Sequence, residues 1–246
     1  MGNLTNKVAI VTGGSRGIGR GIAERLGRDG ATVVVNYAGS EQEAKQVVEA
    51  IASKGGKAIA LQANFSKTED IRRIFQEVSD RFGQLDILIN NAGTGIVAAI
   101  SDVTEEDYDK VFNLNVRGVL FAMQEAAGRM NDGGRIINIS STTTMHPEPG
   151  MAVYAASKAA IKLFTVVMAK EVGDRGITVN TVMPGPTIPG MFGNMPPEVQ
   201  QQAAASSPFN RVGTPQDIAD IVAFLVSEEA RWLTGQDICA NGGAKT

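Results

Sequence analysis

The amino-acid sequence predicts an α/β fold built on one parallel sheet with helices on both faces. Short runs of β-branched residues alternate with longer amphipathic stretches along all 246 residues, which is the pattern of repeated strand–helix units. The runs Val33–Val35 and Ile87–Ile89 are apolar at every position, as expected for strands that helices cover on both sides. No internal repeat or charged linker divides the chain, so we expect one doubly wound domain over residues 1–246.

Seven strands and six long helices follow from these patterns. We expect the strands near residues 7–12, 32–36, 57–62, 86–90, 134–140, 176–182 and 236–239. We expect the helices near residues 16–29, 41–53, 68–81, 105–130, 153–173 and 215–227, with a short helical stretch near 198–205.

Composition and charge exclude several classes of function. The formal net charge of −3 and the pI of about 5.3 give no basic surface for nucleic acid or anionic lipid. The chain has no apolar run of about eighteen residues and no apolar segment typical of a signal peptide, so we expect a cytoplasmic protein that does not enter a membrane. With one histidine, His146, and one cysteine, Cys239, we expect no metal site. The apolar neighbours of Cys239 predict that it is buried.

A glycine-rich loop joins the first predicted strand to the first predicted helix. It reads Thr12-Gly13-Gly14-Ser15-Arg16-Gly17-Ile18-Gly19, and its G-x-x-x-G-x-G spacing differs from the G-x-G-x-x-G of many dinucleotide-binding folds. Glycines permit a close approach of the backbone to a pyrophosphate, whose charge the helix N-terminus then stabilises. A tight turn alone would also need glycines, but the strand–loop–helix context favours dinucleotide binding.

A tyrosine and a lysine four residues apart form the second candidate site. Tyr154 and Lys158 lie in an alanine-rich stretch with helical character, so their side chains project from one face, a turn apart. A free tyrosine has a pKa of about 10. An adjacent cation would lower that pKa and make Tyr154 useful as a general acid and base. Ser141 ends the preceding strand and could bond a substrate oxygen, although the Tyr-Lys spacing alone also occurs by chance on surface helices.

Five motifs in the correct order resemble those of the classical short-chain dehydrogenase/reductase family. Besides the glycine loop and the Ser141, Tyr154 and Lys158 set, the chain has Asn90-Asn91-Ala92-Gly93, Asn115-Val116-Arg117-Gly118, and Pro184-Gly185 followed by Thr187. The resemblance covers nearly the whole chain and points to the subgroup of 3-oxoacyl-acyl-carrier-protein reductases and related bacterial ketone reductases. It implies a single-domain Rossmann-like fold and an NADP-dependent oxidoreductase.

The resemblance implies a role for each matched residue. Hydride would pass between nicotinamide C4 and a carbonyl carbon, with Tyr154 donating the proton to the oxygen that Ser141 holds. Lys158 would lower the pKa of Tyr154 and bind the ribose hydroxyls, and Asn115 would position a water beside it, although a mid-helix asparagine could instead bond the backbone at a kink. The cofactor contacts implied are Gly13, Ser15, Arg16, Gly17, Ile18, Gly19, Asn91, Ala92, Gly93, Tyr154, Lys158, Pro184, Gly185 and Thr187.

The residues after the second strand favour NADP(H) over NAD(H). An acidic residue there would bond the adenosine ribose 2′-hydroxyl and repel a 2′-phosphate, but the chain has Val35-Asn36-Tyr37 and no acid before Glu41. Arg16 can supply a cation for the 2′-phosphate, with Asn36, Tyr37 and Ser40 beside it, unless Arg16 is only a solvated surface charge. After the third strand, Asn64 replaces the aspartate that the family usually carries near the adenine and keeps an acceptor there.

The segment at about 186–211 is expected to cover the substrate. Its prolines and glycines break regular structure and its methionines and phenylalanine offer adaptable apolar surface, which suits a mobile lid; an ordered loop is the alternative. No lysine or arginine lies between Thr187 and Asn210, which disfavours a strongly anionic small substrate. The expected pocket is mostly apolar and is formed by Thr94, Thr142, Thr143, Val153, Ile188, Met191, Phe192 and Met195.

We expect a small-molecule carbonyl or alcohol as the substrate. Carrier-protein reductases present basic side chains to an acidic carrier, but here Arg129 and Arg175 are diluted by Asp132 and Asp174, which gives little electrostatic steering. A free ketone or β-ketoester is therefore favoured, with a 3-oxoacyl-acyl-carrier-protein as the alternative. A non-catalytic dinucleotide sensor is less consistent with the complete catalytic tetrad that the resemblance implies, namely Asn115, Ser141, Tyr154 and Lys158. A dehydratase or epimerase of the same superfamily would need a longer substrate domain.

A homotetramer is the expected assembly. The family commonly forms homotetramers, and the stretch 153–173 is apolar on nearly all sides. Such a helix requires burial on more than one side, which a symmetric oligomer supplies.

Overall fold

The computed structural model describes residues 3–244 and contains a seven-stranded parallel sheet in the order β3-β2-β1-β4-β5-β6-β7. The strands are β1 (Val8–Val11), β2 (Thr32–Tyr37), β3 (Lys57–Gln62), β4 (Ile87–Asn90), β5 (Arg135–Ile139), β6 (Thr178–Pro184) and β7 (Asp237–Ala240). At the end of β1, Val11 pairs with Val35 on one side and Ile89 on the other. The winding direction of the chain changes there, which confirms the predicted doubly wound α/β fold.

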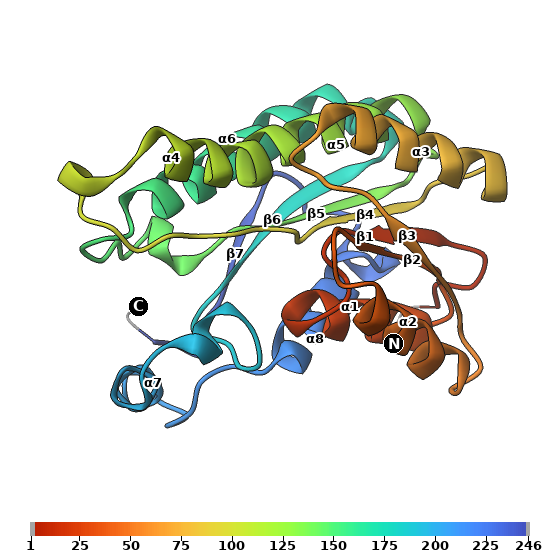
Figure 1. Ribbon diagram of the computed structural model, residues 1–246. Helices are drawn as coiled ribbons and strands as arrows, with labels where there is room; N and C mark the ends of the chain where they lie inside the picture. The colour runs from red at the N-terminus through yellow and green to blue at the C-terminus, as the bar shows by residue number, and fades with distance from the viewer. Residues whose placement is uncertain (1–2, 245–246) are drawn as a thin grey trace.

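Eight α-helices are connected to this sheet within residues 3–244. They are α1 (Gly17–Arg28), α2 (Glu41–Ala52), α3 (Thr68–Phe82), α4 (Glu105–Phe112), α5 (Gly118–Arg129), α6 (Ala152–Glu171), α7 (Pro197–Ala205) and α8 (Pro215–Leu225). Figure 1 shows α3, α4, α5 and α6 over one face of the sheet and α1, α2 and α8 over the other, with α7 outside both layers. Strands covered on both faces explain the continuous apolar runs in the sequence.

The predicted single helix over 105–130 is wrong in one respect. A π-helical turn, Asn113–Arg117, separates α4 from α5. A π turn holds one more residue than an α turn and often occurs at functional sites. Here Asn115 is the buried residue of the turn, so the irregularity positions that side chain.

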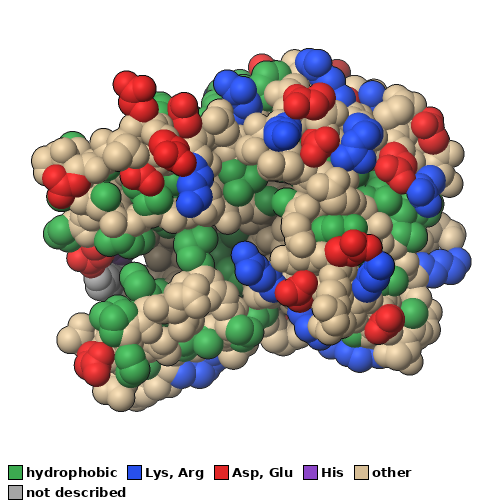
Figure 2. All heavy atoms as spheres, in the orientation of Figure 1, with side chains coloured by type: hydrophobic (Ala, Val, Ile, Leu, Met, Phe, Trp, Pro, Cys, Tyr) green, Lys and Arg blue, Asp and Glu red, His purple; other side chains and the backbone are tan. Residues whose placement is uncertain are grey.

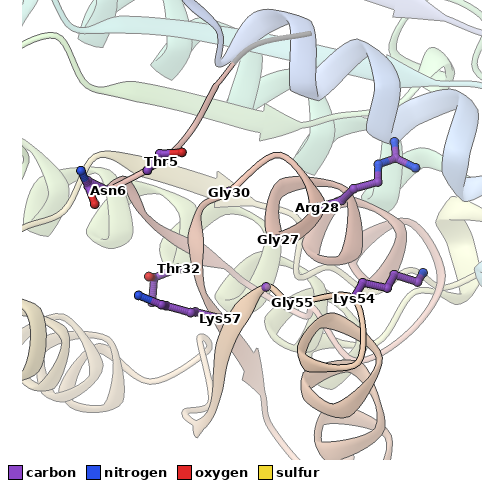
Figure 3. A pocket seen from close by; sticks show the side chains of 10 residues that line it. Thr5, Asn6, Gly27, Arg28, Gly30, Thr32, Lys54, Gly55 and Lys57 are labelled. Carbon is purple, nitrogen blue, oxygen red and sulfur yellow. The ribbon is translucent and has the colours of Figure 1, made fainter.

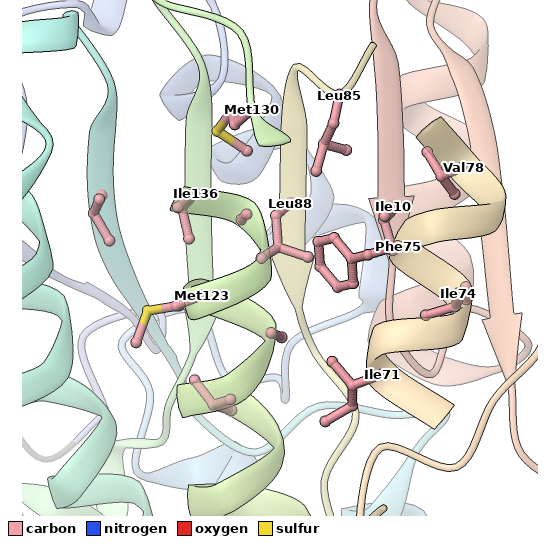
Figure 4. Packing of buried hydrophobic residues seen from close by; sticks show 14 of the residues in the cluster. Ile10, Ile71, Ile74, Phe75, Val78, Leu85, Leu88, Met123, Met130 and Ile136 are labelled. Carbon is pink, nitrogen blue, oxygen red and sulfur yellow. The ribbon is translucent and has the colours of Figure 1, made fainter. Parts of the chain in front are cut away.

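Two apolar cores fix the strands between the helix layers. One core lies between the sheet and α3, α5 and α6, where Phe75 points between Ile10 and Leu88 (Figure 4). The other lies beneath α1, α2 and α8 and includes Ile22 and Ile218. Burial of each such side chain contributes about 1.5–3 kcal/mol. The carboxyl ends of the strands are therefore a rigid base for the loops beyond them.

A chain of buried hydrogen bonds sets the position of α6 on the sheet. Asn90 Nδ2 donates to Asn138 Oδ1 at 2.8 Å, and Asn138 Nδ2 donates to Thr165 Oγ1 at 2.8 Å. Thr181 Oγ1 donates to the same Thr165 oxygen at 2.8 Å. Because unpaired polar groups are costly in a core, this chain favours one register of α6 against β4, β5 and β6.

The apolar character of α6 comes from its place in the core layer. Within residues 3–244 it is the one helix long and apolar enough by composition to span a membrane. However, it packs against β6, and its Ser157, Lys158 and Thr165 are buried polar residues. These features are typical of the core helix of an α/β domain.

A pocket of about 240 Å³ lies near the amino-terminal ends of β2 and β3, away from the carboxyl ends of the strands. Arg28 and Lys54 lie at the ends of α1 and α2 and point away from Lys57 across the pocket (Figure 3). Cations at helix C-termini offset the negative end of the helix dipole. This arrangement accounts for Arg28 and Lys54 without a ligand.

Cys239 departs from the sequence-based expectation. Its side chain is exposed, because β7 is an edge strand of the sheet that the structure describes and alternate residues of β7 face outward. Partial burial still raises the pKa of the Cys239 thiol.

Candidate active site

The glycine loop turns sharply between β1 and α1. Gly13 and Gly17 have φ angles of 61° and 54°, in the left-handed region that favours glycine. At Gly19, a Cβ atom would meet the carbonyl oxygen of Gly13 and lie 2.5 Å from Asn91 Nδ2. Helix α1 begins without a side-chain cap and has no acidic residue in its first turn. Its N-terminal N–H groups are therefore suited to an anion such as a pyrophosphate.

Asn91 fixes the glycine loop from the neighbouring strand. Its Nδ2 donates to the carbonyl oxygens of Thr12 at 2.9 Å and Gly13 at 3.1 Å. In return, Thr12 Oγ1 accepts the backbone N–H groups of Asn91 and Ala92, both at 2.9 Å. The Asn91 side chain thus holds the cofactor loop in shape, whereas a direct cofactor contact by its amide would require these bonds to break.

Asn36 has a different place from the one expected at a 2′-phosphate. Its side chain is only 2% exposed. The Oδ1 atom accepts the N–H of Gly13 at 3.2 Å, and Nδ2 donates to backbone carbonyls that include Ala63 O at 3.0 Å. These bonds use the amide to link β1, β2 and β3, so we correct its expected role from phosphate contact to support of the glycine loop.

The other residues expected at the adenosine end remain accessible. Arg16 is exposed and has no ion pair or side-chain hydrogen bond to another residue in 3–244. Ser40 precedes α2 and its hydroxyl does not cap the helix. Asn64 uses Oδ1 to accept the backbone N–H and hydroxyl of Ser66. Ser15 is buried within the loop, and Ile18 and Tyr37 are half-buried.

The catalytic candidates come together from three elements. Ser141 follows β5, Tyr154 and Lys158 lie on α6, and Asn115 lies in the π turn before α5. The Ser141 hydroxyl lies near enough to the Tyr154 phenol to lower its pKa by hydrogen bonding. Lys158 Nζ lies 5.9 Å from the centre of the Tyr154 ring. The structure therefore brings the four residues predicted from distant motifs into one cluster.

Lys158 is a buried cation with one backbone partner. Its side chain is 4% exposed, and Nζ donates to Ile139 O at 2.9 Å. A Cβ atom at Gly93 would lie 3.2 Å from Nζ, so the glycine leaves room for the ammonium group. Burial lowers the pKa of Lys158 to about 8 because the low-dielectric interior disfavours the charged form.

The pKa of Tyr154 shifts in the direction opposite to the sequence-based expectation. Burial raises the pKa of Tyr154, and the hydrogen bond from Ser141 opposes that rise only in part. Lys158 donates to Ile139 O instead of the phenol oxygen. The phenol is therefore protonated at neutral pH, which is the state that a proton donor needs.

Asn115 acts on the backbone of the loop that follows β4. Its Oδ1 accepts the N–H of Thr94 at 2.9 Å, and its Nδ2 donates to Thr94 O at 2.8 Å. Nδ2 also donates to Ser157 Oγ at 3.0 Å. Asn115 thus bonds the backbone, as the alternative to positioning a water predicted. Through Ser157 the same side chain ties the Thr94 loop to α6.

Pro184, Gly185 and Thr187 connect β6 to the expected lid. Thr187 Oγ1 donates to Gly185 O at 2.9 Å, and the Thr187 backbone pairs with Gly213. This pairing closes the base of the segment 186–211. The segment then forms a 3-10 turn (Met191–Asn194) and α7.

A hollow lies beside α7, the helix of the segment expected to cover the substrate. Figure 2 shows this hollow between α7 and the helices above it, with hydrophobic side chains along its rim. Met191 is exposed, whereas Thr94, Thr142, Thr143, Val153, Ile188, Phe192 and Met195 are half-buried. His146 lies in the loop before α6, and its buried Nε2 has no hydrogen-bond partner in residues 3–244.

Comparisons with known proteins agree with this geometry. The family profile described as enoyl-(acyl carrier protein) reductase matches residues 13–245. The hydroxynaphthalene reductase-like protein Arp2 of Metarhizium majus is 43% identical over 258 residues, which cover 99% of this chain and 97% of that protein. A short-chain dehydrogenase/reductase from Serratia marcescens has a TM-score of 0.95 at 40% identity, covering 99% of this chain and 100% of its own. The angucycline C-6 ketoreductase LanV with bound NADP has a TM-score of 0.94 at 43% identity, covering 99% of this chain and 97% of that chain.

The chain belongs to the short-chain dehydrogenase/reductase family. These matches make it an NADP-dependent oxidoreductase of this family. Within this short-chain dehydrogenase/reductase, three supporting hydroxyls were missed from the sequence. Ser140 Oγ donates to Lys158 O at 2.8 Å, Ser157 Oγ donates to Tyr154 O at 2.7 Å, and Thr12 holds the Asn91 loop. Thr12 and Ser140 directly follow the apolar strands β1 and β5, and Ser157 lies on α6. Each is a small polar residue next to or near a motif residue, and that contrast was the available signal.

Proposed function

We propose that this protein uses NADPH to reduce the carbonyl group of a free, flat, fused-ring ketone. The placement of Ser141 beside the protonated Tyr154, with the buried Lys158 next to the ring, carries the proposal. The mostly apolar set of residues expected around the substrate supports the substrate class, as does the similarity to a hydroxynaphthalene reductase-like protein and an angucycline ketoreductase.

The chain's own residues account for the proton transfer. Ser141 donates a hydrogen bond to the carbonyl oxygen, and Tyr154 transfers its phenolic proton to that oxygen as negative charge develops there. When bound, reduced nicotinamide supplies the hydride to the carbonyl carbon, which completes the secondary alcohol. The nearby Lys158 ammonium stabilises the resulting phenolate by charge attraction. Lys158 would also hold the ribose hydroxyls beside Tyr154.

A preference for NADP(H) over NAD(H) follows from the charge at the adenosine end. Arg16 is an exposed cation that is free of ion pairs within residues 3–244. Ser40 lies at the start of α2, and its hydroxyl does not cap that helix. We therefore expect Arg16→Ala to weaken NADPH binding about tenfold or more and to leave NADH binding nearly unchanged. Arg20→Ala is the matched control, since Arg20 is an exposed cation in the first turn of α1 that pairs with Glu24 at 2.7 Å. Equal losses for both cofactors in Arg16→Ala would contradict the preference.

A free substrate is favoured over one bound to an acidic carrier protein. Arg129 Nε donates to Glu125 Oε2 at 2.9 Å. Arg175 Nε donates to Asp132 Oδ1 at 2.9 Å and its guanidinium also bonds Ala127 O. Cations already paired in this way offer little attraction to an acidic partner.

A homotetramer remains our proposal for the assembly. Leu163 and Val167 of α6 are 69% and 53% exposed, and Trp232 before β7 is 94% exposed. Two separate apolar surfaces of this kind suit two different two-fold interfaces. Light scattering after size-exclusion chromatography tests the proposal, and Leu163→Glu should reduce the mass by splitting the interface on α6.

The function is tested by following NADPH absorbance with a panel of carbonyl compounds. The panel contains fused-ring phenolic ketones, simple aryl ketones, β-ketoesters, acetoacetyl thioesters and an enoyl thioester, each repeated with NADH. Turnover concentrated on the fused-ring ketones supports the proposal, whereas turnover on the thioesters assigns the protein to acyl-chain metabolism. Tyr154→Phe should abolish turnover and keep NADPH binding, because the substitution removes only the proton donor. Ketone reduction at the wild-type rate by Tyr154→Phe would refute the mechanism.

A further inference from the structure

The turn after β5 constrains the hydroxyl group of Ser141 from one side. Ser141 precedes the 3-10 turn Thr142–Thr144 and its Oγ accepts the backbone N–H of Thr143 at 3.2 Å. The Thr143 hydroxyl donates to the same Ser141 Oγ at 3.0 Å. Ser141 is 8% exposed, so solvent has little access to compete for these bonds.

A serine hydroxyl has two acceptor lone pairs and one proton. Thr143 occupies both lone pairs through its backbone and its side chain. The Ser141 proton is then left for another acceptor, and the Tyr154 phenol lies within its reach. With Thr143 in place, Ser141 can act toward Tyr154 or a substrate oxygen only as a donor.

We propose that Thr143 is a positioning residue that fixes the direction of the Ser141 proton toward the reacting oxygen. This inference rests on the proposed carbonyl reduction. In the free protein, donation from Ser141 stabilises the Tyr154 phenolate. With substrate bound, the same proton stabilises the negative charge that develops on the carbonyl oxygen. Without the Thr143 hydroxyl, one lone pair of Ser141 is free and its proton can turn to other acceptors.

The neighbouring threonines have other partners, which gives a matched control. Thr144 Oγ1 donates to the carbonyl oxygen of Ser141 at 2.9 Å and does not bond its hydroxyl. Thr144→Val therefore removes a hydroxyl from the same turn and leaves the Ser141 proton constrained. Thr143→Ser keeps the hydroxyl of Thr143 and should restore the wild-type behaviour.

The first readout does not depend on turnover. The pKa of the Tyr154 phenol is obtained from ultraviolet titration, as the difference between each protein and the same protein carrying Tyr154→Phe. Lys158 on α6 and His146 on the loop before it are the other titratable groups near this site, and they are the same in every variant. We expect Thr143→Val to raise the pKa of Tyr154 by about half a unit, since a weaker Ser141 bond no longer lowers it as far.

The second readout is the rate of ketone reduction with saturating NADPH. We expect Thr143→Val to lower kcat about fivefold with little change in the KM for NADPH. Thr143→Ser should match wild type in both readouts, and Thr144→Val should leave the pKa of Tyr154 unchanged. An unchanged pKa in Thr143→Val, or an equal rise in Thr144→Val, would overturn the inference. A wild-type protein that reduces no ketone would refute the proposed function and still leave the titration able to test the role of Thr143.

Discussion

Raising the pH from neutrality should stabilise the cofactor-free protein through Lys158. Burial lowers the pKa of this lysine from 10.5 to about 8. Between these two values the unfolded chain binds more protons at this position than the folded chain, so the free energy of unfolding rises with pH. One pKa unit corresponds to about 1.4 kcal/mol, so the whole interval is worth about 3 kcal/mol. About half of this gain should appear between about pH 8 and about pH 9.5.

Urea unfolding of the cofactor-free wild-type protein and of Lys158→Met measures this gain. Methionine has similar length and no charge, so the free energy of unfolding of Lys158→Met should exceed that of wild type near pH 7 and the gap should close as the pH rises. The comparison at each pH removes the contribution of other groups, including Cys239, whose raised thiol pKa acts in the opposite direction. A gap that is constant or that widens with pH would show that Lys158 is not a buried cation with a lowered pKa.

Further substitutions test other parts of the site. Gly19→Ala should weaken NADPH binding at least about tenfold, because its Cβ would meet Gly13 O and Asn91 Nδ2. Gly128→Ala is the control, since a Cβ there meets nothing within 4 Å and NADPH binding should not change. Fluorescence titration with NADPH measures both affinities. Thr165→Val leaves Asn138 and Thr181 without their shared partner and should cost about 1–3 kcal/mol in urea unfolding, with Thr165→Ser as the control. The bonds from Arg211 hold the pKa of Asp217 far below its usual value of 3.8. The stabilisation is therefore complete above that value and is lost as the pH falls below it, so Asp217→Asn should flatten the acid side of the stability curve measured by urea midpoints.

The positions of the strands and helices could be predicted from the sequence because apolar runs mark the strands clearly. Apolar runs such as Val33–Val35 end at turn-forming residues, and the predicted bounds agree with β2 and β3 within one residue. The tetrad could also be identified, since Ser141, Tyr154 and Lys158 belong to motifs with fixed spacing. Their gathering in one cluster then follows from the sheet order, which places the ends of β4 and β5 side by side.

The remaining differences depend on three-dimensional surroundings that spacing does not report. Asn36 was expected to face a phosphate. Successive side chains of a strand point to opposite faces of the sheet, and the Asn36 side chain points toward the backbone of Gly13 and Ala63. The direction of the Tyr154 pKa shift depends on how deeply the phenol is buried. It also depends on which acceptor the Lys158 ammonium group bonds, and that acceptor is Ile139 O. Neither depth nor direction is encoded in the four-residue interval between them.

The π turn at Asn113–Arg117 makes this part of the protein unusually sensitive to chain length. An added residue rotates all that follows by about 100° around the helix axis, so α4 and α5 present faces that no single helical wheel aligns. Deleting one residue here would restore an uninterrupted α-helical ladder and satisfy helix propensity. The same deletion would turn the amide of Asn115 away from Thr94 and Ser157. A deletion of one residue that helix propensity alone would favour would thus release the Thr94 loop from α6.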